Sequence, residues 1–151
     1  MHRSDLNITA AWGIALLRVV TGIIFLMHGQ QKLFEFGIGG VSGMMTGLGV
    51  PAPGFMAIVV TLVELVGGIA LIVGAFTRIA ALLVAIDVLV AFFLVHLPNG
   101  FFATNGGVEL VLMLATVGVT LILTGPGAMA LDSVLPVERR LQPTKLSPSS
   151  R

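Results

Sequence analysis

The stretch LLRVVTGIIFLMHGQQKL, residues 16–33, decides the fold because it places charged and polar side chains in an apolar run of membrane-spanning length. Ionisable groups in hydrocarbon cost ~2.5–3.5 kcal/mol each on insertion scales, so they usually face a bundle interior and mark a site. At about 100° per residue, one helical stripe carries Arg18, Thr21, Gly22, Phe25, His28, Gly29 and Lys32. The two glycines remove side-chain bulk, so we expect another helix to pack closely against this stripe.

The composition is that of a membrane protein. Of 151 residues, 56% are hydrophobic and 10% are charged, whereas soluble domains carry about 25% charged residues. The net charge of +1 gives no reason to expect a nucleic-acid partner. The chain has no cysteine, which excludes disulfides, covalent c-type haem and cysteine-ligated iron–sulfur or zinc sites within it. We expect no metal site, and any redox chemistry would need a borrowed cofactor.

Four apolar runs are each long enough to cover ~30 Å of hydrocarbon, which takes about 20 helical residues. They cover residues 11–33, 55–76, 79–97 and 107–124. Backbone groups in lipid must be satisfied internally, so these runs are expected to be helices. The sequence therefore predicts an all-α integral membrane four-helix bundle with up-down-up-down wiring. We expect one domain over residues 1–135 and a basic, disordered cytoplasmic tail over residues 136–151.

The connection between the first two spans is long and rich in glycine. Within it, Val41, Met44, Met45 and Leu48 recur at helical spacing, and Pro51 follows. This pattern predicts a short interfacial helix that ends before the proline and lies as a lid on the outer face.

Basic residues lie mainly on one side of the predicted bundle. That side carries both termini and includes Arg3, Arg78, Arg139, Arg140, Lys145 and Arg151. The opposite side has Lys32 at its edge. Because cytoplasmic loops carry the excess of lysine and arginine, both termini are expected to be cytoplasmic.

Arg18 and Glu64 are predicted to form an ion pair between the first two spans. Glu64 shares a stripe with Gly67 and Gly68, so its carboxylate lies where another helix packs closely. At a rise of about 1.5 Å per residue, Glu64 lies ~14 Å and Arg18 ~20 Å from the outer face, a gap that an arginine can close. The sequence leaves open whether this pair only locks the helices or takes part in function.

The third span carries Asp87 near mid-membrane, and we group Asp87 with Arg18 and Glu64 in a buried ion-pair cluster. His96 ends the same span, nine residues later. This spacing puts the two residues on opposite sides of a straight helix, so we do not expect them to share a pocket. His96 is interpreted as an ordinary boundary residue, and a haem held between it and His28 as unfavoured.

The fourth span opens with Asn105, a candidate N-cap, and with Glu109, which complements the helix dipole. Glu109 also lies at the expected depth of His28 and Lys32. Two further interpretations therefore remain open, a shared outer-side site and a plain salt bridge between Glu109 and Lys32.

Taken in order, these motifs resemble the DoxX family of bacterial membrane proteins over residues 12–135. They are Arg18 with Gly22, His28-Gly29 with Lys32, Glu64 with Gly67-Gly68, Gly74 with Thr77-Arg78, Asn105-Gly106-Gly107 with Glu109, and the closing GPGAMALD at 125–132. The family is similar to the membrane subunit of thiosulfate:quinone oxidoreductases. The resemblance implies a multi-pass protein of the bacterial inner membrane that faces quinone or organises soluble redox proteins.

The charged groups agree with that implication in part. Arg18 and Lys32 stand against Glu64, Asp87 and Glu109, so one acid is expected to bind a proton or a histidine to be charged. A quinone headgroup needs a proton donor or acceptor at each carbonyl beside an apolar cleft. We predict such a quinone or small-molecule pocket below the lid, with the residues His28, Lys32, Glu109 and Asn105. Catalytic residues are not predicted.

The leading hypothesis is a membrane subunit of a quinone-linked oxidoreductase, working in the lipid bilayer with a soluble or membrane redox partner. It predicts no covalently bound cofactor, and quinone as the ligand. The alternative is a non-enzymatic assembly or scaffold protein that recruits a partner. A homo-oligomer is left open by the sequence. Small-solute transport ranks last, because the cytoplasmic half of the fourth span offers only Thr116 and Thr120 as a polar path.

Overall fold

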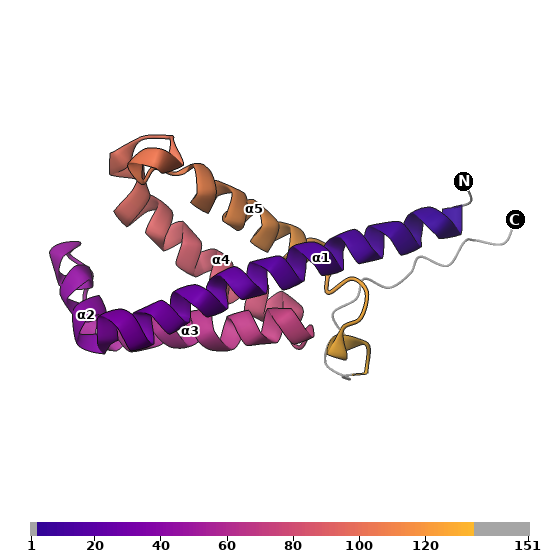
Figure 1. Cartoon of the computed structure of the whole chain (residues 1–151), viewed down its shortest axis with the longest axis horizontal. Coiled ribbons are helices and arrows are strands. Elements are labelled where there is room, and N and C mark those ends of the chain that lie inside the picture. The colour runs from indigo at the N-terminus through magenta and orange to yellow at the C-terminus, as the bar shows by residue number, and fades with distance from the viewer. Residues whose placement is uncertain (1–2, 135–151) are drawn as a thin grey trace, which may run out of the picture.

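The computed structural model describes residues 3–134 and consists of helices joined by short turns (Figure 1). The main helices are α1 (Arg3–Gln30), α2 (Gly37–Gly47), α3 (Pro53–Val73), α4 (Thr77–Ala91) and α5 (Glu109–Thr124). Two π-helical segments extend α1 and α4, namely η1 (Gln31–Phe36) and η2 (Phe92–His96). Three 3₁₀ turns complete the order: η3 (Leu97–Asn99), η4 (Ala103–Asn105) and η5 (Leu131–Ser133). The all-α bundle predicted from the sequence is confirmed.

The bundle consists of two antiparallel helix pairs. Helix α1 packs along α3, and α4 packs along α5, while α3 also contacts α2 and α4. In Figure 1 the two pairs lie close together at the end that holds the N-terminus, and they diverge toward the end that holds α2. The predicted interfacial helix is α2, which ends at Gly47, before Pro51 as expected.

Glycines bring α1 and α3 into backbone contact. A Cβ atom built on Gly22 would lie 2.7 Å from the carbonyl oxygen of Gly68, and one on Gly29 would lie 2.7 Å from the backbone nitrogen of Leu65. A real Cβ cannot approach backbone atoms this closely, so only glycine fits at these positions. The close helix partner predicted for the stripe at residues 18–32 is therefore α3.

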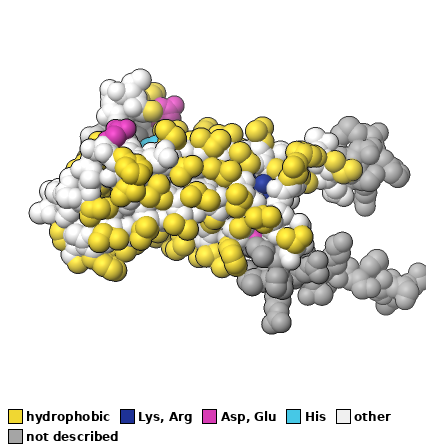
Figure 2. Space-filling model, turned by 60° about the horizontal axis from the view of Figure 1, so that its bottom comes forward, with side chains coloured by type: hydrophobic (Ala, Val, Ile, Leu, Met, Phe, Trp, Pro, Cys, Tyr) yellow, Lys and Arg dark blue, Asp and Glu magenta, His cyan; other side chains and the backbone are white. Residues whose placement is uncertain are grey.

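Three helical stretches are long and apolar enough to cross a membrane: Asn7–Gly47, Pro53–Val73 and Thr77–Asn99. The fourth, Glu109–Thr124, is also apolar but has 16 residues, or ~24 Å at about 1.5 Å per residue. Large apolar side chains are exposed along every main helix, and Figure 2 shows them covering the middle of the molecule. This surface is that of a multi-pass membrane protein, since lipid is the solvent that accepts it.

Candidate functional site

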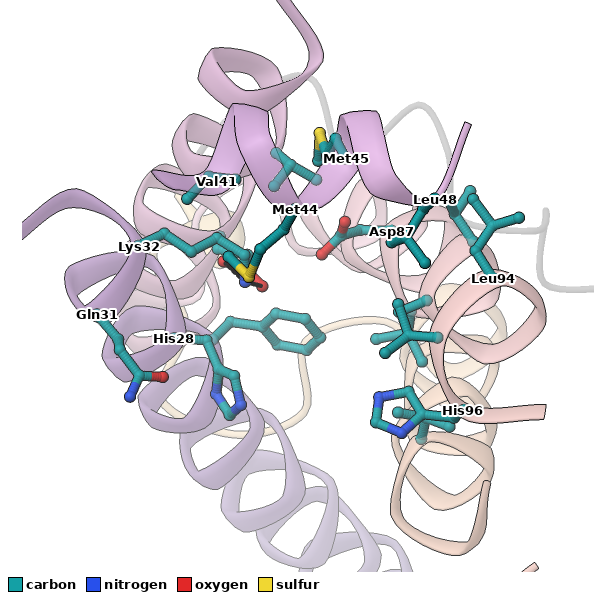
Figure 3. A pocket seen from close by; sticks show the side chains of 18 of the residues that line it. His28, Gln31, Lys32, Val41, Met44, Met45, Leu48, Asp87, Leu94 and His96 are labelled. Atoms are coloured by element: carbon teal, nitrogen blue, oxygen red, sulfur yellow. Dashed lines mark hydrogen bonds and ion pairs between the residues drawn. The ribbon is translucent and has the colours of Figure 1, made fainter. Parts of the chain in front are cut away.

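A cavity of about 360 Å³ lies between the two helix pairs, at the end where they diverge, and α2 lies across it (Figure 3). All five main helices and both π segments contribute to its wall. Five of its polar or ionisable lining residues are His28, Lys32, Glu64, Asp87 and His96. The apolar positions that predicted α2 also line it: Val41, Met44, Met45 and Leu48.

Lys32, Glu64 and Asp87 form the charged cluster of the cavity wall. The ammonium nitrogen of Lys32 lies 2.8 Å from one carboxylate oxygen of Glu64 and 2.7 Å from the other. Asp87 reaches the same place from α4 and interacts electrostatically with both residues. Since Glu64 is only 5% exposed, its charge needs the lysine as its partner. The cluster holds two acids and one base, so it carries one negative charge unless it binds a proton.

The predicted pair of Arg18 and Glu64 does not form. The Arg18 guanidinium instead donates to the carbonyl oxygens of Met129, at 3.0 Å, and Ala128, at 3.4 Å. Depth in the membrane does not by itself determine the partner, because an arginine can extend in either direction along its helix. Here Arg18 extends toward the terminal end, where the irregular segment after α5 presents carbonyls, and Lys32 takes Glu64.

Asp132 lies in the same irregular segment after α5, and the sequence predicted no structural role for it. Its carboxylate accepts hydrogen bonds from the backbone nitrogens of Phe76, at 2.5 Å, and Thr77, at 2.9 Å. It thereby satisfies donors at the start of α4 that the helix leaves unpaired. The structure explains the need for this contact: the N-cap position of α4 is Phe76, which has no capping side chain.

Asp87 and His96 line the same cavity, so the expectation that they do not share a pocket was wrong. That expectation assumed a straight α-helix. Residues Phe92–His96 instead form a π segment. A π-helix has more residues per turn than an α-helix, so each residue rotates less about the axis, and His96 faces the cavity. Such π segments are often found at functional sites, and η1 provides Gln31, Lys32 and Phe36 to the same cavity.

The predicted site residues Asn105 and Glu109 lie outside the cavity lining. Glu109 is the first residue of α5, and its carboxylate accepts a hydrogen bond from the backbone nitrogen of Ala103 at 2.9 Å. Asn105 belongs to the turn η4 and does not cap α5, which starts after Val108. The alternative salt bridge between Glu109 and Lys32 is replaced by the pair of Lys32 and Glu64. Of the four predicted pocket residues, the structure brings together His28 and Lys32.

Comparison with known proteins agrees with this architecture. The family model described as DoxX matches residues 13–97. "Putative oxidoreductase CatD" of Bacillus subtilis is 38% identical over 80% of this chain and 84% of its own length. An uncharacterised protein of Haemophilus influenzae is 36% identical over 80% of this chain and 88% of its own length. "Inner membrane protein YqjF" of Escherichia coli is 34% identical over 82% of this chain and 92% of its own length.

No solved structure matches the chain significantly. The family match covers more than half of the 151 residues, and these relatives extend over most of it. The order of motifs from Arg18 to Asp132, the helix bundle and these relatives lead to one conclusion: the chain belongs to the DoxX family of membrane proteins.

Proposed function

We propose that this protein is the membrane subunit of a quinone-linked oxidoreductase and that it binds a quinone headgroup in the cavity beneath α2. The observation that carries the proposal is the composition of the cavity wall. Ionisable groups from α1, α3 and α4 converge there on a space that is otherwise lined by aliphatic, aromatic and methionine side chains. Small-molecule sites typically combine an apolar wall with a few placed polar groups.

The size of the cavity supports a single-ring headgroup. Its volume of about 360 Å³ lies near the lower end of the range of roughly 300–1,000 Å³ for ligand sites. A quinone also carries an apolar tail, for which the exposed apolar faces of the helices and the surrounding lipid are a suitable environment. A large soluble cofactor would match neither the volume nor the surface.

The chain's own residues supply sites where protons can be held. A bound quinone exchanges two electrons together with two protons. Lys32, Asp87 and the two histidines lie in the cavity wall, where they can donate or accept those protons. The electrons would come from a redox partner, soluble or in the membrane. The name of the relative from Bacillus subtilis, an oxidoreductase, supports this part of the proposal.

A cavity-filling substitution tests the proposal. Val60 lies in the cavity wall on α3, and Leu62 on the same helix is 51% exposed and outside it. We expect wild-type protein, extracted gently from the membrane, to carry quinone at close to one per chain by mass spectrometry. Val60→Trp should lower that amount about tenfold because the indole occupies the headgroup space, while Leu62→Trp should leave it unchanged.

Both variants should elute as the wild type does on gel filtration, which separates lost binding from lost folding. Absence of quinone from the wild type, together with a non-redox protein bound stoichiometrically to every variant, would favour the scaffold alternative.

We further propose that both termini face the cytoplasm of a bacterial inner membrane, on the basis of the arginines at the terminal end and the relative from Escherichia coli. The chain has no natural cysteine, so one introduced cysteine gives a unique label. Thr104 and Ser133 are exposed at opposite ends of α5. An impermeant maleimide should label Thr104→Cys in intact cells and Ser133→Cys only after permeabilisation. The reverse pattern would invert the topology.

A further inference from the structure

The two histidines of the cavity are held in one tautomer by backbone carbonyls. The Nδ1 atom of His28 lies 2.9 Å from the carbonyl oxygen of Ile24, and that of His96 lies 2.7 Å from the carbonyl oxygen of Gly106. A carbonyl oxygen only accepts hydrogen bonds, so Nδ1 must carry the proton in both rings. In each neutral imidazole the remaining nitrogen, Nε2, is therefore an acceptor with a free lone pair.

These acceptors belong to different helix pairs. His28 is on α1 and His96 ends the π segment that extends α4, and both line the cavity. Figure 3 shows the two rings on facing sides of the open space, with Asp87 on a third side. The cavity thus presents acceptors from opposite walls.

The donors of the other polar groups are partly engaged within the protein. Lys32 directs its ammonium group at both carboxylate oxygens of Glu64. The side-chain nitrogen of Gln31 donates to Glu35, at 3.1 Å. Asp87, when ionised, can only accept. With Asp87 ionised, a ligand in this cavity therefore finds the two histidine acceptors and the Asp87 carboxylate, against the N–H groups that Lys32 and Gln31 have left.

We infer that the cavity binds the reduced, dihydroxy form of its ring ligand more tightly than the oxidised quinone, with His28 and His96 as hydrogen-bond acceptors. This inference rests on the proposed function and specifies the redox form that the site recognises. A 1,4-hydroquinone carries its two hydroxyl donors at opposite ends of the ring, which suits acceptors on opposite walls. A quinone carbonyl is itself an acceptor and gains no hydrogen bond from an Nε2 lone pair.

The test compares one ligand in its two redox states. Protein freed of bound lipid is reconstituted in nanodiscs under anaerobic conditions, and its affinity for decylubiquinol and for decylubiquinone is measured. We expect the wild type to bind the quinol about tenfold more tightly. His28→Leu and His96→Leu should each weaken quinol binding about tenfold, the value of one good hydrogen bond, and change quinone binding less than about twofold.

Two further variants make the test specific. Glutamine keeps an acceptor oxygen, so His96→Gln should retain more quinol affinity than His96→Leu. Thr116 lies on α5 outside the cavity lining, where its hydroxyl donates to the carbonyl oxygen of Leu112. Thr116→Val should bind both redox forms as the wild type does.

Wild-type protein that binds both forms equally, or prefers the quinone, overturns this inference and leaves the proposed function standing. Histidine variants that weaken both forms equally also overturn it, because the rings would then only shape the cavity. Wild-type protein that binds neither form contradicts the proposed function itself. The wild-type comparison needs no variant, so the result does not depend on whether a substituted protein folds.

Discussion

Replacing Lys32 with methionine should lower the free energy of unfolding by about 3–5 kcal/mol, the usual cost of removing one partner from a buried ion pair. The substitution keeps an aliphatic stem of similar length but leaves Glu64 and Asp87 facing each other without a cation. Glu64 is 5% exposed, so water cannot replace the lysine. Unfolding of the detergent-solubilised protein by increasing SDS would measure the loss.

Because the cluster holds two acids and one base, the loss of stability should differ between substitutions of Lys32 and of Glu64. Glu64→Gln should cost much less than Lys32→Met, because the lysine then still has Asp87 nearby. Adding Glu64→Gln to Lys32→Met should restore much of the lost stability, since it removes one of the two unpaired acids. Equal losses from both single substitutions that simply add in the double variant would contradict this arrangement.

Arg18 provides the matched control for the single and double substitutions of Lys32 and Glu64. It is 1% exposed, but its hydrogen bonds are to the carbonyls of Ala128 and Met129 and not to Glu64. Arg18→Met should therefore destabilise the protein additively with Glu64→Gln, as unconnected sites do. Strong coupling between Arg18 and Glu64 would instead support the ion pair that the sequence alone predicted.

The sequence predicted the bundle well because lipid leaves few alternatives. A run of about 20 apolar residues must be helical in hydrocarbon. The last three spans start and end close to the predicted limits, whereas α1 begins at Arg3, well before the predicted start at residue 11. The glycines of α1 and α3 also identified the closest helix pair, since Gly22 and Gly68 meet in the structure. The lid followed from four apolar residues at helical spacing.

The site was harder to predict because it depends on rotation and on long-range partners. The π segment at Phe92–His96 alters which side of the helix His96 occupies, and no residue in that segment predicts a π-helix. The choice between Arg18 and Lys32 as the partner of Glu64 depends on the direction in which each long side chain extends. Asp132 binds the backbone nitrogens of Phe76 and Thr77 at the start of α4, which are 56 and 55 residues earlier in the chain.

The glycine contact between α1 and α3 and the ion pair of Lys32 with Glu64 connect the stability of the bundle to the shape of the cavity. Lys32 lies one turn after Gly29, the residue whose missing side chain lets α3 approach α1. Glu64 lies beside Leu65, the residue that Gly29 contacts. The close helix contact therefore sets the separation across which Lys32 reaches Glu64, and a change that separates α1 from α3 should also disturb the cavity wall.

Gly68→Ala tests this connection directly and should be among the most destabilising single-methyl additions in the chain. A Cβ at Gly68 would lie 2.6 Å from the backbone nitrogen of Leu26 and 2.8 Å from the carbonyl oxygen of Gly22. Backbone atoms cannot rotate away as a side chain can, so α1 and α3 must separate. We expect a loss of about 3 kcal/mol in the free energy of unfolding, at the upper end of the usual cost of overpacking.

Gly13→Ala is the matched control, because a Cβ at this position of α1 would have no neighbour within 4 Å. Alanine favours the helix over glycine by up to about 1 kcal/mol, so this variant should be as stable as the wild type or slightly more stable. The separation of α1 and α3 in Gly68→Ala should also weaken the contact of Lys32 with Glu64. Adding Lys32→Met to Gly68→Ala should then cost less than Lys32→Met costs alone. A full, additive loss would show that the ion pair and the glycine contact are independent.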